Sequence, residues 1–432
     1  MTTTTRNLSA LAFACALTLT AAPPAEHWVA TWGTAEQLAV TGGAAGGRGA
    51  SGPMVGVVPS AQPAPLPPGT PQRRFPIPPT LLGLNNQTVR MIVRTSLGGT
   101  KVRIRLSNAV GGASVSLGAA HIAIRSKDSA TVPGSDRPLT FSGRPSPTIY
   151  AGETIVSDPV TLTVPALTDL AVSLYFSKQT SAQTNHRFSL HTTYISKEGD
   201  FTAQPAIPDP AGVAESYYYL AGVDVVAPAD AGTIVTFGDS ITDGDQSSLN
   251  TNSEWPAVLA ARLQKNKATA HIGVVNAGIS GNRILGDNGG GMVRFFHDAL
   301  DQPGVKWITL LEGINDINGG AQKDDLIAAY RQIIAMAHGA GVKAIGCTLT
   351  PFGGASSYNP AREEIRSALN DFIRTSDEFD AVIDFDAAVR DPADPKRYRK
   401  EADSPDMLHP GDAGYKLMGE AVNLAIFAPG KK

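Results

Sequence analysis

The hydrophobic pattern of the chain changes character near Gly232. Before this point, from about residue 87 to residue 226, apolar and polar residues alternate, as in 101–106 (KVRIRL) and 170–177 (LAVSLYFS). An alternation with period two is typical of strands that bury one face. Short strands of this kind, separated by turn residues, predict an antiparallel β-sandwich or jelly-roll-like domain over 87–228.

After Gly232, continuous apolar runs alternate with stretches of helical period. The apolar runs lie at 233–237, 273–276, 305–311, 342–349 and 381–385. The predicted helices lie near 254–264, 324–338, 361–374 and 412–427. Apolar strands with intervening helices predict a five-stranded parallel sheet that is covered on both faces. Ligands of such sheets bind beyond the carboxyl ends of the strands, so the loops that follow the strands are the places to search for a site.

The first residues are typical of an export signal. Arg6 precedes an apolar run over 8–19, and the small residues Ala21 and Ala22 are followed by Pro23. This run is too short to span a bilayer, and the pattern predicts a signal peptide cleaved after Ala22, with a buried N-terminal helix as the alternative. No later stretch is apolar for long enough to cross a membrane, so we expect a secreted or periplasmic protein.

A segment rich in Gly, Ala and Pro follows between residues 38 and 80 and contains no acidic residue. Such a segment buries little apolar surface and predicts a long loop, which interrupts a strand expected over 28–37. The expected divisions are a signal peptide at 1–22, the N-terminal strand and loop at 23–86, the β-sandwich at 87–228, and an α/β domain at 229–432.

Charge and cysteine content exclude several classes of function. The chain has 36 Lys and Arg against 39 Asp and Glu, so there is no basic surplus for nucleic acid. Its two cysteines, Cys15 and Cys347, cannot build a zinc site or a disulfide framework, and Cys347 is expected to be a small buried hydrophobe. His186 and His191 have no Asp, Glu or Cys nearby at ligand spacing, so solvated or core histidines are expected rather than metal ligands.

Polar residues with chemical potential follow the predicted parallel strands. Ser240 comes directly after the first strand, Gly281 lies in the loop after the second, and Asn315 follows the third. Asp406 lies three residues before His409, after the fifth strand, which places a carboxylate within reach of Nδ1. Singly, each has an ordinary structural reading as a helix N-cap, a turn glycine or an Asx-turn. Together they occupy the same edge of one sheet.

These segments resemble, in order and content, the four sequence blocks of the SGNH (GDSL) hydrolase family. The blocks correspond to 238–240 (GDS), Gly281, 313–316 (GIND) and 406–409 (DMLH), and the resemblance spans residues 232 to about 427. It implies a flavodoxin-like sheet and an open, shallow site. The chain has no G-x-S-x-G motif, so the α/β-hydrolase alternative lacks its signature.

The resemblance also implies residue roles. Ser240 would be the nucleophile, His409 the general base, and Asp406 the residue that orients His409. The backbone N–H groups of Ser240 and Gly281 and the side-chain amide of Asn315 would form the oxyanion hole. No metal or organic cofactor is required. Activity is expected to fall as His409 becomes protonated, near pH ~6–7 for an unperturbed imidazole.

Other polar residues near these blocks have structural readings. Asp239 and Asp316 are expected to bind nearby backbone groups. Arg283 and Arg294 follow the second strand, where they would meet an anionic substrate or, as the favoured reading, serve surface solubility.

An export signal and a β-sandwich ahead of such a domain are similar in architecture to bimodular carbohydrate esterases. We therefore expect a serine esterase for short acyl esters, acetyl foremost, on a small molecule or a polysaccharide. A lipase or lysophospholipase for longer chains is one alternative, and a glycan-binding protein with an inert hydrolase domain is another. The β domain would bind glycan, form a wall of the cleft, or stabilise the enzyme.

Overall fold

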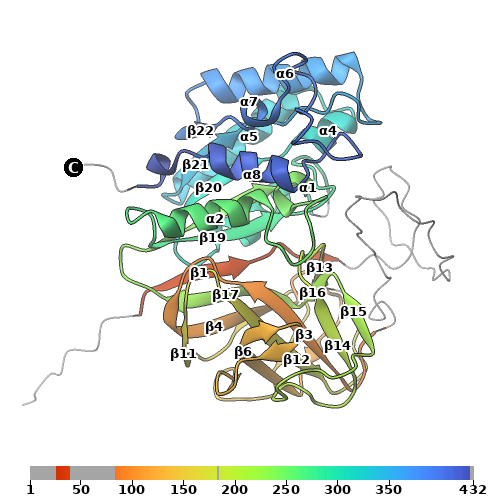
Figure 1. The fold of residues 1–432 in the computed structure, drawn as a ribbon, viewed down its shortest axis with the longest axis vertical. Helices are drawn as coiled ribbons and strands as arrows, with labels where there is room; N and C mark the ends of the chain where they lie inside the picture. The colour runs from red at the N-terminus through yellow and green to blue at the C-terminus, as the bar shows by residue number, and fades with distance from the viewer. Residues whose placement is uncertain (1–25, 39–82, 182–183, 288, 429–432) are drawn as a thin grey trace, which may run out of the picture.

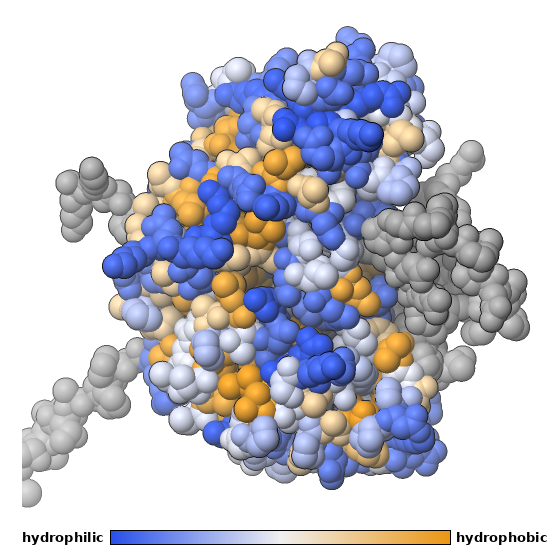
Figure 2. All heavy atoms as spheres, viewed as in Figure 1, coloured by the Kyte–Doolittle hydropathy of each residue, from blue (hydrophilic) through white to orange (hydrophobic). Residues whose placement is uncertain are grey.

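A computed structural model describes residues 26–38, 83–181, 184–287 and 289–428, which form two bodies stacked along the long axis of the molecule (Figure 1). The predicted signal peptide and almost all of the Gly/Ala/Pro-rich loop lie outside the described residues. The face shown in Figure 2 mixes hydrophilic and hydrophobic side chains, with the hydrophobic ones in small groups. Within the described ranges, no helix is long and apolar enough to cross a membrane.

The N-terminal body is an antiparallel β-sandwich, as predicted. Its five-stranded sheet runs in the order β1 (Trp28–Gly33), β17 (Leu220–Val226), β4 (Gly99–Ser107) and β10 (Thr154–Val156), with β11 (Val160–Val164) also on β4. Its seven-stranded sheet runs in the order β15 (Gly212–Ala214), β14 (Thr193–Glu198), β3 (Gln87–Arg94), β12 (Asp169–Phe176), β6 (Ala119–Lys127) and β7 (Ala130–Thr131), with β8 (Arg137–Pro138) also on β6. Apolar side chains of both sheets, such as Ile104 of β4 and Val172 of β12, form one buried cluster.

Two small sheets complete this body. One contains β16 (Ser216–Tyr218), β13 (Thr184–Arg187) and β2 (Gln37–Leu38), and the other contains β5 (Val115–Ser116) and β9 (Thr148–Ile149). The strand expected over 28–37 is therefore divided between β1, in the main sheet, and β2. Strand β13 lies at the junction with the second body, close to α1 (Figure 1).

The C-terminal body is built on a five-stranded parallel sheet, which confirms the predicted α/β fold. The strand order is β19 (Ile272–Gly278), β18 (Gly232–Gly238), β20 (Val305–Leu311), β21 (Lys343–Cys347) and β22 (Ala381–Ile383). The first strand in sequence thus lies second in the sheet, which is the flavodoxin-like order. Cys347 is fully buried at the end of β21, as expected.

Helices connect these strands, and α2 packs on α8 while α5 packs on α6. Their bounds are α1 (Ser240–Asp243), α2 (Trp255–Lys265), α3 (Gly291–Phe295), α4 (Ile314–Asn318), α5 (Lys323–Gly339), α6 (Pro360–Thr375), α7 (Phe385–Val389) and α8 (Asp412–Ala421), with a π-helical turn η2 (Phe296–Leu300) after α3 and a 3-10 turn η3 (Leu424–Ile426) after α8. The four predicted helices are α2, α5, α6 and α8, although α8 ends at Ala421 rather than near 427. The predicted strand 381–385 also ends early, because the Asp384 side chain caps α7 by accepting the N–H of Ala387 at 3.1 Å.

The two bodies share a hydrogen-bonded interface along β1. The N–H of Ala30 in β1 donates to the carbonyl of Pro303 at 2.8 Å, and the Thr233 hydroxyl donates to the carbonyl of Ala30 at 3.1 Å. From the β3–β4 connection, Ser96 Oγ accepts the N–H of Val274 in β19 at 2.8 Å. The β-sandwich is therefore joined to the parallel sheet through buried polar contacts close to the strands that carry the candidate site.

Candidate active site

Ser240 lies at the turn between β18 and α1. The Asp239 side chain caps α1 by accepting the N–H of Ile241 at 3.0 Å, and Ser240 is the first residue of the helix. Gly238 makes the tight turn possible, because a Cβ there would lie 2.3 Å from the carbonyl oxygen of Leu311. The Ser240 side chain is thus presented at the carboxyl edge of the sheet. Asp239 has the structural role expected for it.

His409 and Asp406 complete a chain of hydrogen bonds to Ser240. His409 Nε2 lies 2.8 Å from Ser240 Oγ, and His409 Nδ1 lies 2.7 Å from Asp406 Oδ2. The other carboxylate oxygen of Asp406 accepts the backbone N–H groups of Leu408 at 2.9 Å and His409 at 3.0 Å. The carboxylate therefore accepts the Nδ1 proton, which leaves Nε2 to accept the proton of the Ser240 hydroxyl.

The surroundings of Asp406 and His409 lower the pKa of the carboxyl and raise the pKa of the imidazole. Burial opposes ionisation of Asp406, but its hydrogen bonds with His409 and the adjacent backbone lower its pKa below the usual range. Burial likewise lowers the pKa of His409, yet the hydrogen bond to Asp406 and the nearby carboxylates Asp245 and Asp239 raise it above 6.5 overall. The acid limb expected near pH 6–7 for an unperturbed imidazole therefore moves to higher pH.

The three predicted oxyanion-hole groups lie on neighbouring loops of the same edge. Gly281 has φ +82°, which favours glycine, and within the described ranges its N–H has no hydrogen-bond acceptor. The N–H of Ser240, at the start of α1, is also without an acceptor there. Asn315 in α4 donates one N–H of its amide to the carbonyl of Asn282 at 2.9 Å, which fixes the amide and leaves a second N–H.

Asp316 ties α4 to the loop after β19. Its carboxylate accepts the N–H groups of Ile284 and Leu285, both at 2.9 Å. Burial raises the pKa of Asp316 to about 6, in spite of these bonds. This is the structural role predicted for Asp316, and it holds the loop that carries Gly281 against the helix that carries Asn315.

Arg294 differs from the expectation of a surface residue. Its side chain is only 7% exposed and stacks on Phe237, with the guanidinium carbon 3.9 Å from the ring centroid. The guanidinium donates to the Gly238 carbonyl at 2.9 Å, the Ala277 carbonyl at 2.8 Å and the Asn282 side chain at 2.7 Å. The short helix α3 places Arg294 beneath the carboxyl ends of β18 and β19. The sequence does not predict this burial, because α3 is too short to show a helical period.

The two histidines that follow one another in the sequence of the β domain, His186 and His191, are buried. His186 and His191 are 4% and 5% exposed, so of the two expected readings the core reading holds. Within the described part of the chain, no group of three His, Cys, Asp or Glu residues could hold a metal ion.

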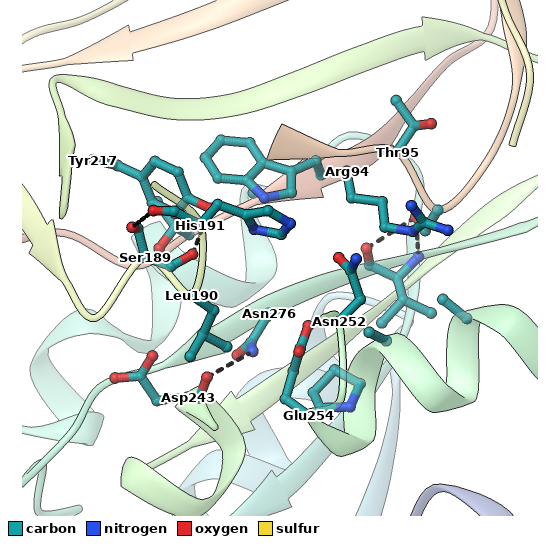
Figure 3. Close-up of a pocket in the computed structure, with 18 of the residues that line it drawn as sticks. Arg94, Thr95, Ser189, Leu190, His191, Tyr217, Asp243, Asn252, Glu254 and Asn276 are labelled. Atoms are coloured by element: carbon teal, nitrogen blue, oxygen red, sulfur yellow. Dashed lines mark hydrogen bonds between the residues drawn. The ribbon is translucent and has the colours of Figure 1, made fainter. Parts of the chain in front are cut away.

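A cavity of about 80 Å³ lies between the two bodies, beside these histidines (Figure 3). His191, Asn252 and Glu254 point toward it, and Asp243 and Asn276 border it on the side of the α/β domain. Burial raises the pKa of Glu254 to about 7. Neither Ser240 nor His409 lines this cavity, which is therefore separate from the Ser240 site.

A parallel sheet in flavodoxin-like order, with a serine, a histidine and a carboxylate joined at its carboxyl edge, defines a hydrolase of the SGNH type. Residues 236–417 match the model of the GDSL-like lipase/acylhydrolase family. This part of the chain is a GDSL-like hydrolase domain, and the protein is a carboxylic ester hydrolase.

Solved structures match part of the chain at low identity. A GDSL-like lipase from Bacteroides thetaiotaomicron VPI-5482 is 21% identical, with 45% of this chain and 87% of that chain covered and a TM-score of 0.33. A lipolytic protein of the G-D-S-L family from Veillonella parvula DSM 2008 is 20% identical, with 44% and 96% covered and a TM-score of 0.33. An acetylxylan esterase from Geobacillus stearothermophilus is 22% identical, with 46% and 95% covered and a TM-score of 0.36. No curated protein matches the chain.

Proposed function

We propose that the protein is an exported serine esterase that hydrolyses short-chain acyl esters, acetyl foremost, through an acyl-enzyme on Ser240. The observation that carries this proposal is the continuous hydrogen-bond chain from Ser240 Oγ through His409 to Asp406, at 2.8 and 2.7 Å. A serine hydroxyl is a weak nucleophile at its ordinary pKa, and an adjacent imidazole base held by a carboxylate is what activates it.

The reaction follows from these positions. Ser240 Oγ attacks the ester carbonyl while His409 Nε2 takes the hydroxyl proton, and the carbonyl oxygen becomes an oxyanion. His409 then gives that proton to the leaving alcohol as the C–O bond breaks, which leaves an acyl-enzyme. Water attacks the acyl carbonyl, its proton passes to His409 and then to Ser240 Oγ, and the carboxylic acid leaves. The N–H groups of Ser240 and Gly281 and the Asn315 amide would stabilise both oxyanions, and each such donor typically contributes about 3–4 kcal/mol.

The surroundings of the triad favour small acyl groups. In the described segment 406–409, one large hydrophobic side chain is exposed, that of Met407, at 37%. Arg397 lies close to it, since both side chains approach the position of a Cβ on Gly354. The other apolar residue of the segment, Leu408, is partly buried against Ile314 and Phe352. An enzyme for long acyl chains needs apolar surface beside the nucleophile, and this segment offers little of it.

We further propose export through the N-terminal segment, with cleavage after Ala22 and a secreted or periplasmic location. The domain division proposed for the mature chain is a β-sandwich at 87–228 and a hydrolase domain at 229–432. Strand β1 is an addition to the sandwich, because Trp28 pairs with Val226 in the main sheet. An acetylated carbohydrate is the natural substrate class that we propose to examine first, on the architectural similarity to bimodular carbohydrate esterases.

The test is hydrolysis of p-nitrophenyl acetate and p-nitrophenyl octanoate by the mature protein and by S240A. Faster cleavage of acetate, with nearly all activity lost in S240A, is the expected result, and acetylated glycans would follow as substrates. Preference for octanoate would replace the short-acyl proposal with the lipase alternative. Equal activity of S240A and wild type would exclude Ser240 as the nucleophile, and absence of activity in both would favour the inert, glycan-binding alternative.

A further inference from the structure

A buried histidine of the β domain reaches into the hydrolase domain beside the nucleophile. His186 lies in β13, and its Nε2 is 3.1 Å from Oδ1 of Asp243, the last residue of α1. Both side chains are at most 5% exposed. We propose that His186 is a positioning residue for ester hydrolysis, through which the β domain holds the Asp243 carboxylate and, with it, the oxyanion-hole loop.

Asp243 connects the two loops that the reaction needs. Its Oδ2 accepts both the N–H and the hydroxyl of Ser280, each at 2.8 Å. Ser280 directly precedes Gly281, whose N–H is a proposed oxyanion donor, and α1 begins with Ser240. The carboxylate of Asp243 therefore fixes the distance between the nucleophile and that donor. This step rests on the proposed function, because it takes Gly281 as part of the oxyanion hole.

The hydrogen bonds of His186 explain how the β domain holds Asp243. Nδ1 of His186 lies 2.7 Å from the carbonyl oxygen of Ala35, and Nε2 faces the carboxylate. The two ring nitrogens therefore join the β1–β2 connection to α1. Close packing leaves little freedom here, since a Cβ on Gly278 would lie 2.2 Å from the backbone nitrogen of Asp243.

Removal of the imidazole would leave the Asp243 side chain buried without this contact. A buried polar group that loses its partner shifts toward other partners, and such a shift weakens its bonds to Ser280. Displacement of a catalytic group by about 1 Å can cost on the order of 100-fold in rate. We therefore expect kcat of H186A to fall by about 10- to 100-fold with KM changed little, because the oxyanion hole acts on the transition state.

His191 is a matched control. It lies in the same domain, is equally buried, and borders the same cavity between the two bodies. Its Nε2 has no hydrogen-bond partner within the described ranges, so its removal tests the loss of an imidazole without the loss of the Asp243 contact. A merely structural role of His186 would give similar losses in H186A and H191A.

The experiment compares kcat, KM and the unfolding temperature of wild type, H186A, H186Q and H191A with phenyl acetate as substrate. We expect a drop in kcat for H186A that exceeds that of H191A by at least tenfold. H186Q is expected to recover part of the loss, because its amide can donate to Asp243. His186 borders the cavity, so added imidazole should also raise kcat of H186A and not of H191A, after subtraction of the enzyme-free rate.

Equal kcat in H186A and H191A would overturn the inference while the esterase proposal stands, and an inactive wild type would instead overturn the esterase proposal. If H186A does not fold, S280A replaces it, because it removes one of the two hydrogen bonds at the other end of the same link. A loss in kcat of about three- to tenfold for S280A, the effect of one hydrogen bond, would support the inference. A kcat of S280A within twofold of wild type would overturn it.

Discussion

Arg294 is a buried cation beneath the candidate active site, and its replacement by methionine is a direct test of how that site is held. The guanidinium joins the carbonyls of Gly238 and Ala277 to the side chain of Asn282. These groups lie at the end of β18, at the end of β19 and in the loop after Gly281. Methionine has a similar length and no polar atom that could replace these bonds.

The cost of this substitution is set mainly by an ion pair. Arg294 Nη1 lies 3.1 Å from Oδ2 of Asp298, which is 4% exposed, and Nη2 lies 3.8 Å from Oε2 of the fully buried Glu312. The Gly238 carbonyl keeps a second donor, the N–H of Ile279 at 3.0 Å, so it is not left unpaired. Asp298 keeps a second partner, Nδ1 of His297 at 2.8 Å. Removing one partner of a buried pair costs about 3–5 kcal/mol, so we expect R294M to lie at the lower end of this range, still a large fraction of the roughly 5–15 kcal/mol that stabilises a typical domain.

The assay is urea unfolding of R294M, with kcat measured on p-nitrophenyl acetate in the absence of urea. R331M is the matched control, because Arg331 binds both carboxylate oxygens of Glu378 but its side chain is 56% exposed. An exposed pair of this kind contributes little, so R331M is expected to unfold like the wild type. If R294M and R331M unfolded at the same urea concentration, the buried ion pair would not have the role given to it. A folded R294M with full kcat would show that the site does not depend on this anchor.

Two further predictions concern the catalytic groups. The logarithm of kcat/KM is expected to rise with pH through a midpoint above 6.5, because His409 must be neutral to act as a base and its pKa is raised. In D406N this midpoint should move to lower pH, and kcat should fall by about 10³- to 10⁴-fold. An unchanged midpoint in the pH–rate profile of D406N would contradict the pairing of His409 with Asp406. G281A keeps the backbone N–H, but alanine is strained at the φ of +82°, and relaxation of that strain would turn the N–H away from the oxyanion. We expect kcat to fall by about 100-fold. The free energy of unfolding should change by about 1–2 kcal/mol, since a Cβ there meets nothing within 4 Å. Unchanged kcat of G281A would show that the oxyanion hole does not depend on this backbone conformation.

The architecture was predictable where its elements are long. The hydrophobic pattern predicts the five parallel strands and the helices α2, α5, α6 and α8, because each of these strands lies in a continuous apolar run and each helix presents several turns. The short helices α1, α3, α4 and α7 contain five residues or fewer, so no period can appear in them. Two of them begin at a side-chain cap, Asp239 for α1 and Asp384 for α7, whereas α3 and α4 begin without one.

The candidate triad was predictable for a different reason. Asp406 and His409 are three residues apart, and the strand-to-helix turn at Ser240 is local. A short segment of sequence is therefore enough to predict each of these two geometries. The parallel topology then brings the segments to one edge of the sheet, where His409 meets Ser240 across 169 residues. A correct strand order is therefore sufficient to predict that encounter.

The contacts of the residues that support the site could not be predicted in this way. His186 reaches Asp243 across 57 residues and a domain boundary, and Arg294 reaches Gly238 across 56 residues. Neither contact follows from strand order alone, because each depends on how a short strand or a short helix is packed. The one local signal is the spacing of Arg294 and Asp298, which suits an ion pair within one helical turn. A hydrolase domain with its motifs intact but without its β domain would keep the triad and lose the His186 contact, so the catalytic sequence blocks alone do not define the working site.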